Sequence, residues 1–477
     1  MSVVQGVLPY KIESAKAGHL TSFGGLPLVV ELCRRVFGRK MYRTLSRRLG
    51  VGGPSVVRRY VESLVALLVS GGDCIEDIER LRADGGLARL LGFKPTGRTQ
   101  LKEFLYSFHQ DTAGHRLTHA QDAELSKTGV ATIRPEGPGL QALDVLVRSV
   151  VTAAQARRAC QRATLDVDAT IIEAGKERAL VAYEGTRGYQ PQNALWAEQG
   201  LVVADEFRDG NVPAAFAARA FLERAFGALP ASVTERRLRA DSAFYDEAAL
   251  TWADEQAIQF AVSADMSQSL AATVSLLPET SWQPYRSRDE AAGHSSTEER
   301  QWAEVVFVPP WARNHKKTGR AFRYLAIRVR SRQGELFEPS ESSWRHFAVV
   351  TNRDDVNGER LLNWHREKAG TIEHVFGDIK GELGGRTMPT GKFGSNAAWW
   401  RFNVLVYNLL RLLKVQALPE ELHTARPKKL RFHLLNVAGE IVKTAGSLLL
   451  RLAVSAMELA RLQHARQAIA RMPAPST

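Results

Sequence analysis

The stretch TLDVDAT, residues 164–170, alternates polar and apolar side chains with the period of a β-strand. Successive strand side chains point to opposite faces, so Asp166, Asp168 and Thr170 are predicted to share one face while the apolar residues face a core. Two carboxylates so placed repel each other unless a cation, a basic side chain or open water lies opposite them. A hard ion such as Mg²⁺ binds oxygen ligands of this kind. Solvated or salt-bridged aspartates would give the same pattern, so both interpretations stay open at this point.

Length and composition limit the classes of protein to which the chain can belong. A chain of 477 residues is too long for one ordinary core, and several domains are expected. Its 64 Lys and Arg residues against 51 Asp and Glu residues give a net charge of +13, which favours a polyanionic partner, with nucleic acid first. The three cysteines fit neither a disulfide framework nor a zinc spacing, which indicates a reducing compartment. No export signal and no run of about 18 apolar residues is present, so we expect neither export nor a membrane span.

The N-terminal part predicts helices with basic faces. An apolar pattern of helical period runs from Pro27 to about Leu49, a glycine-rich turn follows at 50–54, and a second helix is expected over 55–70. Two basic amphipathic helices joined by such a turn are typical of a helix-turn-helix, which lays one helix against DNA. A helical bundle with a solvated basic face would look the same.

The middle of the chain predicts an α/β domain. After a helix over 140–161 and the strand at 164–170, the expected elements are a returning strand at 179–183, strands at 201–206, 236–240 and 258–262, and helices at 214–229 and 246–256. Three strands, helix, strand, helix, strand is the order of a ribonuclease-H-like (retroviral-integrase-like) domain. Asp241 falls at the end of the fourth strand, and this order leaves Asp168 and Asp241 close together.

The remainder predicts an insertion and a helical end. Between 263 and 345 the helical pattern gives way to strand-like runs, which indicates a β-rich insertion, and 346–351 would return to the main sheet. One helix is expected over 363–383 and another over 397–414. The expected organisation is a helical DNA-binding domain (1–130), a catalytic core in two parts (140–262 and 346–415) around the insertion (263–345), and a basic helical C-terminal region (416–477).

A third carboxylate lies in the helix predicted over 363–383. Arg366, Glu373 and Lys380 are seven residues apart, nearly two turns each, so they would project in one direction beside an apolar stripe. A carboxylate between two cations can bind a metal while the cations hold an anionic substrate. An exposed salt-bridged face is the alternative interpretation.

These features together resemble a known family. The order Asp168, Asp241, Glu373 resembles that of the DDE transposases of bacterial insertion sequences, and the long interval before Glu373 is similar to the branch with a β-rich insertion. That branch has a Tyr-x2-Arg-x3-Glu-x6-Lys signature, of which Glu373 and Lys380 match the second half; His365 and Lys368 stand for the Tyr and Arg, with one extra residue before Glu373. The chain is most similar to insertion-sequence family thirteen-eighty, through LDVDATIIEAGK (165–176), GTRGYQP (185–191), GTIEHVFGDIKGELGG (370–385) and GSNAAWWRFNVLVYNLL (394–410).

The resemblance implies a fold and a chemistry. The expected fold is an α/β ribonuclease-H-like core with a β-rich insertion, an all-α N-terminal DNA-binding domain and a helical C-terminal region. Asp168, Asp241 and Glu373 would be the catalytic residues and the ligands of two Mg²⁺ or Mn²⁺ ions.

The resemblance also assigns supporting residues and partners. His365, Arg366, Lys368 and Lys380 would bind DNA phosphates, with the Arg role open between Arg366 and Lys368. Thr170 and Asp166 could support the ligands from behind, or Asp166 could replace Asp168 as a ligand. The partners would be terminal inverted repeats, target DNA and a second copy of the chain, in the cytoplasm of a bacterium and at its nucleoid. The alternatives are a nuclease that cleaves without joining and an inactive, transposase-derived DNA-binding protein; a repressor-like regulator would not need the three acids.

Overall fold

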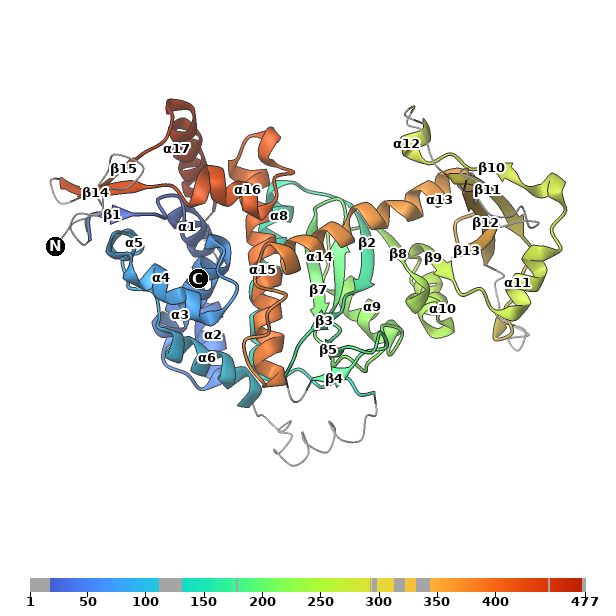
Figure 1. Cartoon of the computed structure of the whole chain (residues 1–477), viewed down its shortest axis with the longest axis horizontal. Coiled ribbons are helices and arrows are strands. Elements are labelled where there is room, and N and C mark those ends of the chain that lie inside the picture. Colours follow the sequence, from blue (N-terminus) through green and yellow to red (C-terminus); the bar gives the residue numbers. More distant parts are fainter. Residues whose placement is uncertain are drawn as a thin grey trace, which may run out of the picture.

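A nine-stranded mixed sheet runs through the protein in the computed structural model, with most of the helices gathered beyond one end of it (Figure 1). The model describes residues 18–110, 131–176, 179–291, 293, 298–312, 322–331, 344–444 and 447–473. The strands are β2 (Arg162–Ala169), β6 (Gln192–Trp196), β7 (Leu201–Glu206), β8 (Glu235–Ala240), β9 (Gln259–Ala264), β10 (Gln283–Pro284), β11 (Glu298–Val305), β12 (Arg323–Ser331) and β13 (Arg345–Thr351). Their order across the sheet is β10-β11-β12-β13-β9-β8-β2-β6-β7.

The five strands β7-β6-β2-β8-β9 form the part predicted from the alternating pattern. β2, β8 and β9 run parallel, while β6 pairs antiparallel with both β2 and β7. Helices α9 (Ala218–Gly227) and α10 (Glu247–Glu255) lie in the two connections that lead to β8 and β9, as a parallel pairing requires. The predicted alternation of helix, strand, helix and strand after the strand at 201–206 is therefore confirmed.

The predicted partner of the first strand is wrong. β2 pairs with β6 and not with residues 179–183, because every residue of β6 is buried and can sit inside a sheet covered on both faces. Val181 and Tyr183 are instead exposed. The intervening segment forms a small separate sheet from β3 (Ile172–Glu173), β5 (Arg187–Tyr189) and β4 (Leu180–Val181).

The insertion extends the main sheet. β13 pairs antiparallel with β9, which confirms the predicted return of this segment to the sheet, and β12, β11 and β10 then add on in turn. The insertion also contains α11 (Gln268–Ser275), η3 (Glu279–Ser281) and α12 (Arg288–Ala291), so it is not purely β. A small hydrophobic cluster joins Trp302 of β11 and Leu325 of β12 to Leu361 of the helix α13 (Gly358–Arg366). This cluster fixes α13 on the insertion.

The N-terminal part is helical between Pro27 and Gln110. Its elements are α1 (Pro27–Val36), α2 (Arg39–Leu49), α3 (Pro54–Ser70), η1 (Ile75–Asp77), α4 (Ile78–Ala83), α5 (Gly85–Leu91) and α6 (Arg98–Gln110). The single helix predicted up to Leu49 is broken at Phe37 and Gly38, neither of which is helical. α3 begins with a proline at its first position and ends at Gly71, whose φ of 102° suits a left-handed helix end. Residues 1–17 and 111–130 of the predicted domain lie outside the described residues.

The C-terminal part is wrongly predicted as helical throughout. Besides η6 (Glu420–Leu422), α16 (Pro427–Leu430), η7 (Arg431–Leu435) and α17 (Ala456–Ala470), it contains a hairpin of β14 (Gly439–Thr444) and β15 (Ser447–Leu452). The N-terminal strand β1 (Leu20–Thr21) pairs with β14, so the two chain ends build one three-stranded sheet. The N-terminal helices are therefore not an independent all-α domain.

Helix α15 (Phe393–Ala417) joins these parts. It is buried along most of its 25 residues and packs against α8 (Pro138–Arg157), α6, α3, α17 and β7. In Figure 1 it stands between the N-terminal helices and the sheet. One continuous hydrophobic core runs through all of these elements, and no described helix is long and apolar enough to cross a membrane.

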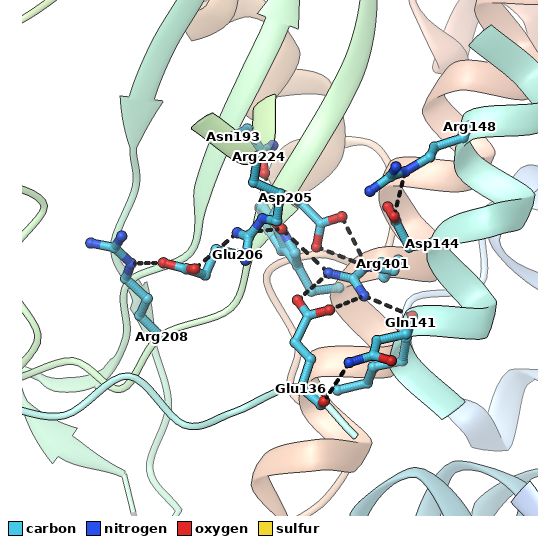
Figure 2. Close-up of polar contacts among 12 residues, drawn as sticks. Glu136, Gln141, Asp144, Arg148, Asn193, Asp205, Glu206, Arg208, Arg224 and Arg401 are labelled. Carbon is cyan, nitrogen blue, oxygen red and sulfur yellow. Dashed lines mark hydrogen bonds and ion pairs between the residues drawn. The ribbon is translucent and has the colours of Figure 1, made fainter. Parts of the chain in front are cut away.

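A buried ion network supports this junction (Figure 2). Arg401 of α15 donates to Asp205 of β7 at 2.9 Å and makes a two-pronged pair with Glu136, at 2.6 and 3.0 Å, just before α8. The side chains of Arg401 and Asp205 are 3% and 1% exposed. The network thus fastens the segment that enters α8 to the sheet.

Candidate active site

Asp168 and Asp241 meet at neighbouring strand ends, as predicted. β2 and β8 are parallel, with Val167 opposite Ala240, so the next residue on each strand is one of these aspartates. Asp241 also caps the short helix η2 (Ser242–Phe244) by accepting from the Ala243 amide at 3.2 Å. Two carboxylates are therefore held side by side where adjacent parallel strands end.

The two carboxylates crowd each other electrostatically. Burial first, and then the charge of Asp168, raise the pKa of Asp241 to about 6, while Lys368 opposes the shift. The ammonium of Lys368 lies 2.7 Å from Asp168 Oδ2, and the Ala169 amide donates to Asp168 Oδ1 at 2.8 Å. One cation thus faces a pair of acids, which leaves the site with excess negative charge.

The helix predicted over 363–383 is broken. α13 ends at Arg366, the short turn η5 (Glu367–Gly370) follows, and α14 (Ile372–Gly381) carries Glu373 in its first turn. Arg239 of strand β8 donates a hydrogen bond to the Trp364 carbonyl at 2.7 Å. The Thr371 hydroxyl donates to the Lys368 carbonyl at 3.0 Å. Carbonyls that a continuous helix would use are thus engaged elsewhere.

The break changes which side chains share a face. Arg366 lies exposed on α13, on a different helix from Glu373 and Lys380, so the predicted single stripe of three residues is wrong. The side chain that reaches the strand carboxylates is that of Lys368, which is buried.

A cavity of about 690 Å³ lies beside these residues. Asp241 and Glu373 both line it, and so do Arg300 of β11, Arg345 of β13 and Arg366 of α13. The insertion therefore contributes cations to the same hollow that holds two of the predicted acids. Such a mixture suits a substrate that carries phosphate groups.

The three predicted acids are not drawn together as tightly as a bound metal would hold them. Among the described residues, the one group of three or more His, Cys, Asp or Glu ligands within 4.8 Å of one another is Asp73, Cys74 and Asp77. Asp168 and Asp241 are in contact, whereas Glu373 stands exposed on α14 at the shared cavity.

The other predicted phosphate contacts divide into two kinds. Burial lowers the pKa of His365 to about 4, and its Nε2 lies 3.1 Å from the Ala240 carbonyl, so a neutral ring offers phosphate no charge. Lys380 is half-buried and donates to the Thr170 hydroxyl at 2.6 Å. The hydrogen bond of the Thr170 hydroxyl is therefore with a lysine and not with the paired aspartates.

Asp166 is fully buried and its two oxygens are engaged. Arg239 donates to them at 2.6 and 2.9 Å, and the Thr371 hydroxyl also donates to one of them. Asp166 is thus placed behind Asp168 on the same face, where it holds neighbouring side chains. Arg239 and Thr371 were not among the residues predicted for the site. The signal in the sequence was an arginine inside a predicted core strand, because a buried charge needs a partner.

Strand-end carboxylates beside a cavity lined by both acidic and basic side chains are typical of enzymes that transfer phosphoryl groups with divalent metals. The chain belongs to the family described as Transposase DDE domain group 1, whose model matches residues 12–474. A search of curated proteins finds no match. Among solved structures, the chain is similar to a cryo-EM structure of a piggyBac transposase synaptic complex with hairpin DNA, at 8% sequence identity and a TM-score of 0.44, over 94% of this chain and 86% of that chain.

Proposed function

We propose that the protein is an active DNA transposase that cleaves DNA at the terminal inverted repeats of its element and joins the ends to target DNA. The observation that carries this proposal is the contact between Asp168 and Asp241 at two parallel strand ends, with Glu373 on the cavity that Asp241 lines. The family match over nearly the whole chain supports it.

The donor set fits Mg²⁺ or Mn²⁺. All three side chains offer carboxylate oxygens, which hard divalent cations prefer. Burial is the main cause of the raised pKa of Asp241, and the charge of Asp168, which a divalent cation would offset, adds to it. Asp168, Asp241 and Glu373 would together hold two such ions. When bound, such a pair of ions supplies Lewis-acid activation of the attacking oxygen and stabilisation of the leaving oxygen.

The chain's own cations would hold the DNA. Lys368 neutralises Asp168 and would turn to a phosphate oxygen when divalent ions share that carboxylate. Arg366 lines the cavity and offers a planar fork that matches phosphate oxygens. Arg300 and Arg345 also line it, and both would have to exchange their present pairing with Glu298 for a phosphate. Lys380, whose ammonium donates to the Thr170 hydroxyl in this structure, would contact a phosphate of the DNA backbone.

Recognition of the terminal repeats would involve helix α2. This helix has no acidic residue. All of its exposed residues are basic, namely Arg39, Lys40, Arg43, Arg47 and Arg48. α3 is buried from Val61 to Val69 and exposes two basic residues, Arg58 and Arg59. Of the two helices predicted as a helix-turn-helix, α2 therefore offers the larger basic face to DNA.

Replacing both Arg43 and Arg47 with Gln is expected to weaken DNA binding at all sequences. Each lost phosphate contact removes about 0.9 from the slope of log affinity against log salt, so the slope should fall by about 2. Fluorescence anisotropy over a salt series measures this. The matched control is Arg219→Gln with Arg461→Gln, an exposed arginine paired with Glu223 and a partly exposed arginine paired with Glu421. An unchanged slope in the α2 variant would exclude this helix from the DNA interface.

The proposal extends to the fold of the core, the kind of mobile element and the number of copies that act together. We infer a ribonuclease-H-like core, because the strand order β7-β6-β2-β8-β9 with its parallel and antiparallel pairings is the one expected of that fold. The motifs support an element of insertion-sequence family thirteen-eighty, acting at the nucleoid in a bacterial cytoplasm. Bringing two element ends together would require two copies of the chain.

A strand-transfer assay tests the function. Purified protein, labelled DNA that carries the element's ends, a supercoiled target plasmid and Mg²⁺ or Mn²⁺ should yield labelled DNA joined to the plasmid. Cleavage without joining would indicate a nuclease on the same fold. Binding without any chemistry would indicate an inactive, transposase-derived DNA-binding protein.

A further inference from the structure

A buried ion cluster behind the paired aspartates links the two halves of the site. Asp166 and Arg239 lie opposite each other on the parallel strands β2 and β8, two residues before Asp168 and Asp241 respectively. Their side chains are 0% and 2% exposed. Burying a charged pair is costly unless its hydrogen bonds are complete, so its presence beside the site calls for a role.

Arg239 reaches from the sheet to the broken helix. Its Nε and Nη2 bind both oxygens of Asp166, and its Nη1 donates to the Trp364 carbonyl at 2.7 Å and to Glu367 Oε2 at 2.5 Å. Its guanidinium also lies over the Trp364 ring, 5.5 Å from the ring centre. The Arg239 side chain thus binds Asp166 of β2 on one side, and the end of α13 and the start of η5 on the other.

Thr371 closes the cluster from the far end of the turn. Its hydroxyl hydrogen-bonds Asp166 Oδ2 and the Lys368 carbonyl. Asp166 is therefore tied to a residue on each side of Lys368, through Arg239 and Glu367 before it and through Thr371 after it. The backbone of residues 364–371 is held onto β2 and β8 at both ends.

We propose that Arg239 is a positioning residue that, with Asp166 and Thr371, holds the 364–373 segment over the strand ends so that Lys368 and Glu373 face Asp168 and Asp241. This inference rests on the proposed transposase function, because it assigns the cluster a part in DNA cleavage. None of the three side chains needs to touch DNA. They set the register between the strand that carries Asp241 and the turn that carries Lys368.

Only an arginine fits this position. The four hydrogen bonds of Arg239 leave in three directions from one planar fork, and a lysine ammonium on a flexible stem cannot reproduce them. Positioning groups of this kind, which orient residues around a metal centre, change activity by about 10- to 100-fold when lost.

The test combines amide hydrogen exchange with cleavage kinetics on Arg239→Gln, Arg239→Lys and the control Arg237→Gln. Arg237 lies on the same face of β8 two residues earlier and pairs with Glu235. Both Arg239 variants should exchange faster over residues 364–373 and not over α15, cleave about 10- to 100-fold more slowly, and bind DNA as tightly as wild type. Arg237→Gln should match wild type in all three measurements.

Two results would overturn the inference. One is a folded Arg239→Gln protein that cleaves at the wild-type rate; the other is unchanged exchange over 364–373. If the Arg239 variants fail to fold, Thr371→Val and Thr371→Ser decide: Val should loosen the segment and slow cleavage, Ser should behave as wild type, and equal behaviour would count against the proposal. Amide exchange is measured without DNA, so it tests whether Arg239 holds residues 364–373 independently of any cleavage. A wild-type protein that cleaves no DNA would refute the proposed function alone.

Discussion

Asp168→Asn is expected to abolish DNA cleavage and leave DNA binding nearly unchanged. Asn keeps the size of the side chain but removes the charge that would hold the divalent ions, which contribute several kcal/mol to the transition state. We therefore expect a loss of at least about 10³-fold in cleavage rate. Binding should persist because affinity for DNA rests on many separate phosphate contacts. A gel assay with end-labelled DNA measures both quantities on the same samples.

Asp265→Asn is the matched control for this variant. Asp265 follows β9, is exposed and lines the cavity that Asp241 and Glu373 also line, but it is not one of the three proposed ligands. It should retain most of the cleavage activity. Wild-type cleavage by Asp168→Asn, or an equal loss in Asp265→Asn, would contradict the assignment of Asp168.

Arg401→Ala is expected to lower the free energy of unfolding by about 3–5 kcal/mol, the usual cost of removing one partner of a buried ion pair. The substitution leaves Asp205 and Glu136 without the guanidinium that now binds both of them (Figure 2). Burial already raises the pKa of Asp205, and Arg401 is the group that opposes this shift most. The Leu140 carbonyl also loses its donor, at 2.9 Å.

Urea denaturation followed by circular dichroism measures this loss. Arg148→Ala is the control, because Arg148 pairs with Asp144 one turn away on α8 and its side chain is 44% exposed. Removing such a surface pair should cost less than about 1 kcal/mol. Equal stabilities of the two variants would show that the buried network does not hold α8, α15 and β7 together.

The strands of the core were predictable because their signal is local. Alternation in residues 164–170 placed Asp166 and Asp168 on one face, and the strand order placed Asp168 beside Asp241. The partner of β2 was not predictable in the same way, because 179–183 reads as a short apolar strand, whereas β6 begins with the polar residues Gln192 and Asn193. Burial in the whole fold selects between them: β6 is buried throughout, and Tyr183 is exposed.

The break in the helix before Glu373 could not be predicted from local periodicity. It depends on Arg239, which lies more than one hundred positions earlier in the chain and takes the Trp364 carbonyl. The same contact explains why Lys368, and not Arg366, reaches Asp168. The pattern of apolar residues in 363–383 was correct for α14 alone, where Ile372, Phe376 and Ile379 are buried.

We propose that Asp168, Asp241 and Glu373 surround one metal centre, and iron-directed cleavage of the polypeptide can locate that centre. Fe²⁺ with ascorbate replaces Mg²⁺ in the complex with DNA, and mass spectrometry locates the cuts made by hydroxyl radicals near the metal. We expect cuts close to all three residues, and excess Mg²⁺ should suppress all of these cuts together. Cuts confined to the exposed group at Asp73, Cys74 and Asp77, or near only one of the three acids, would contradict it.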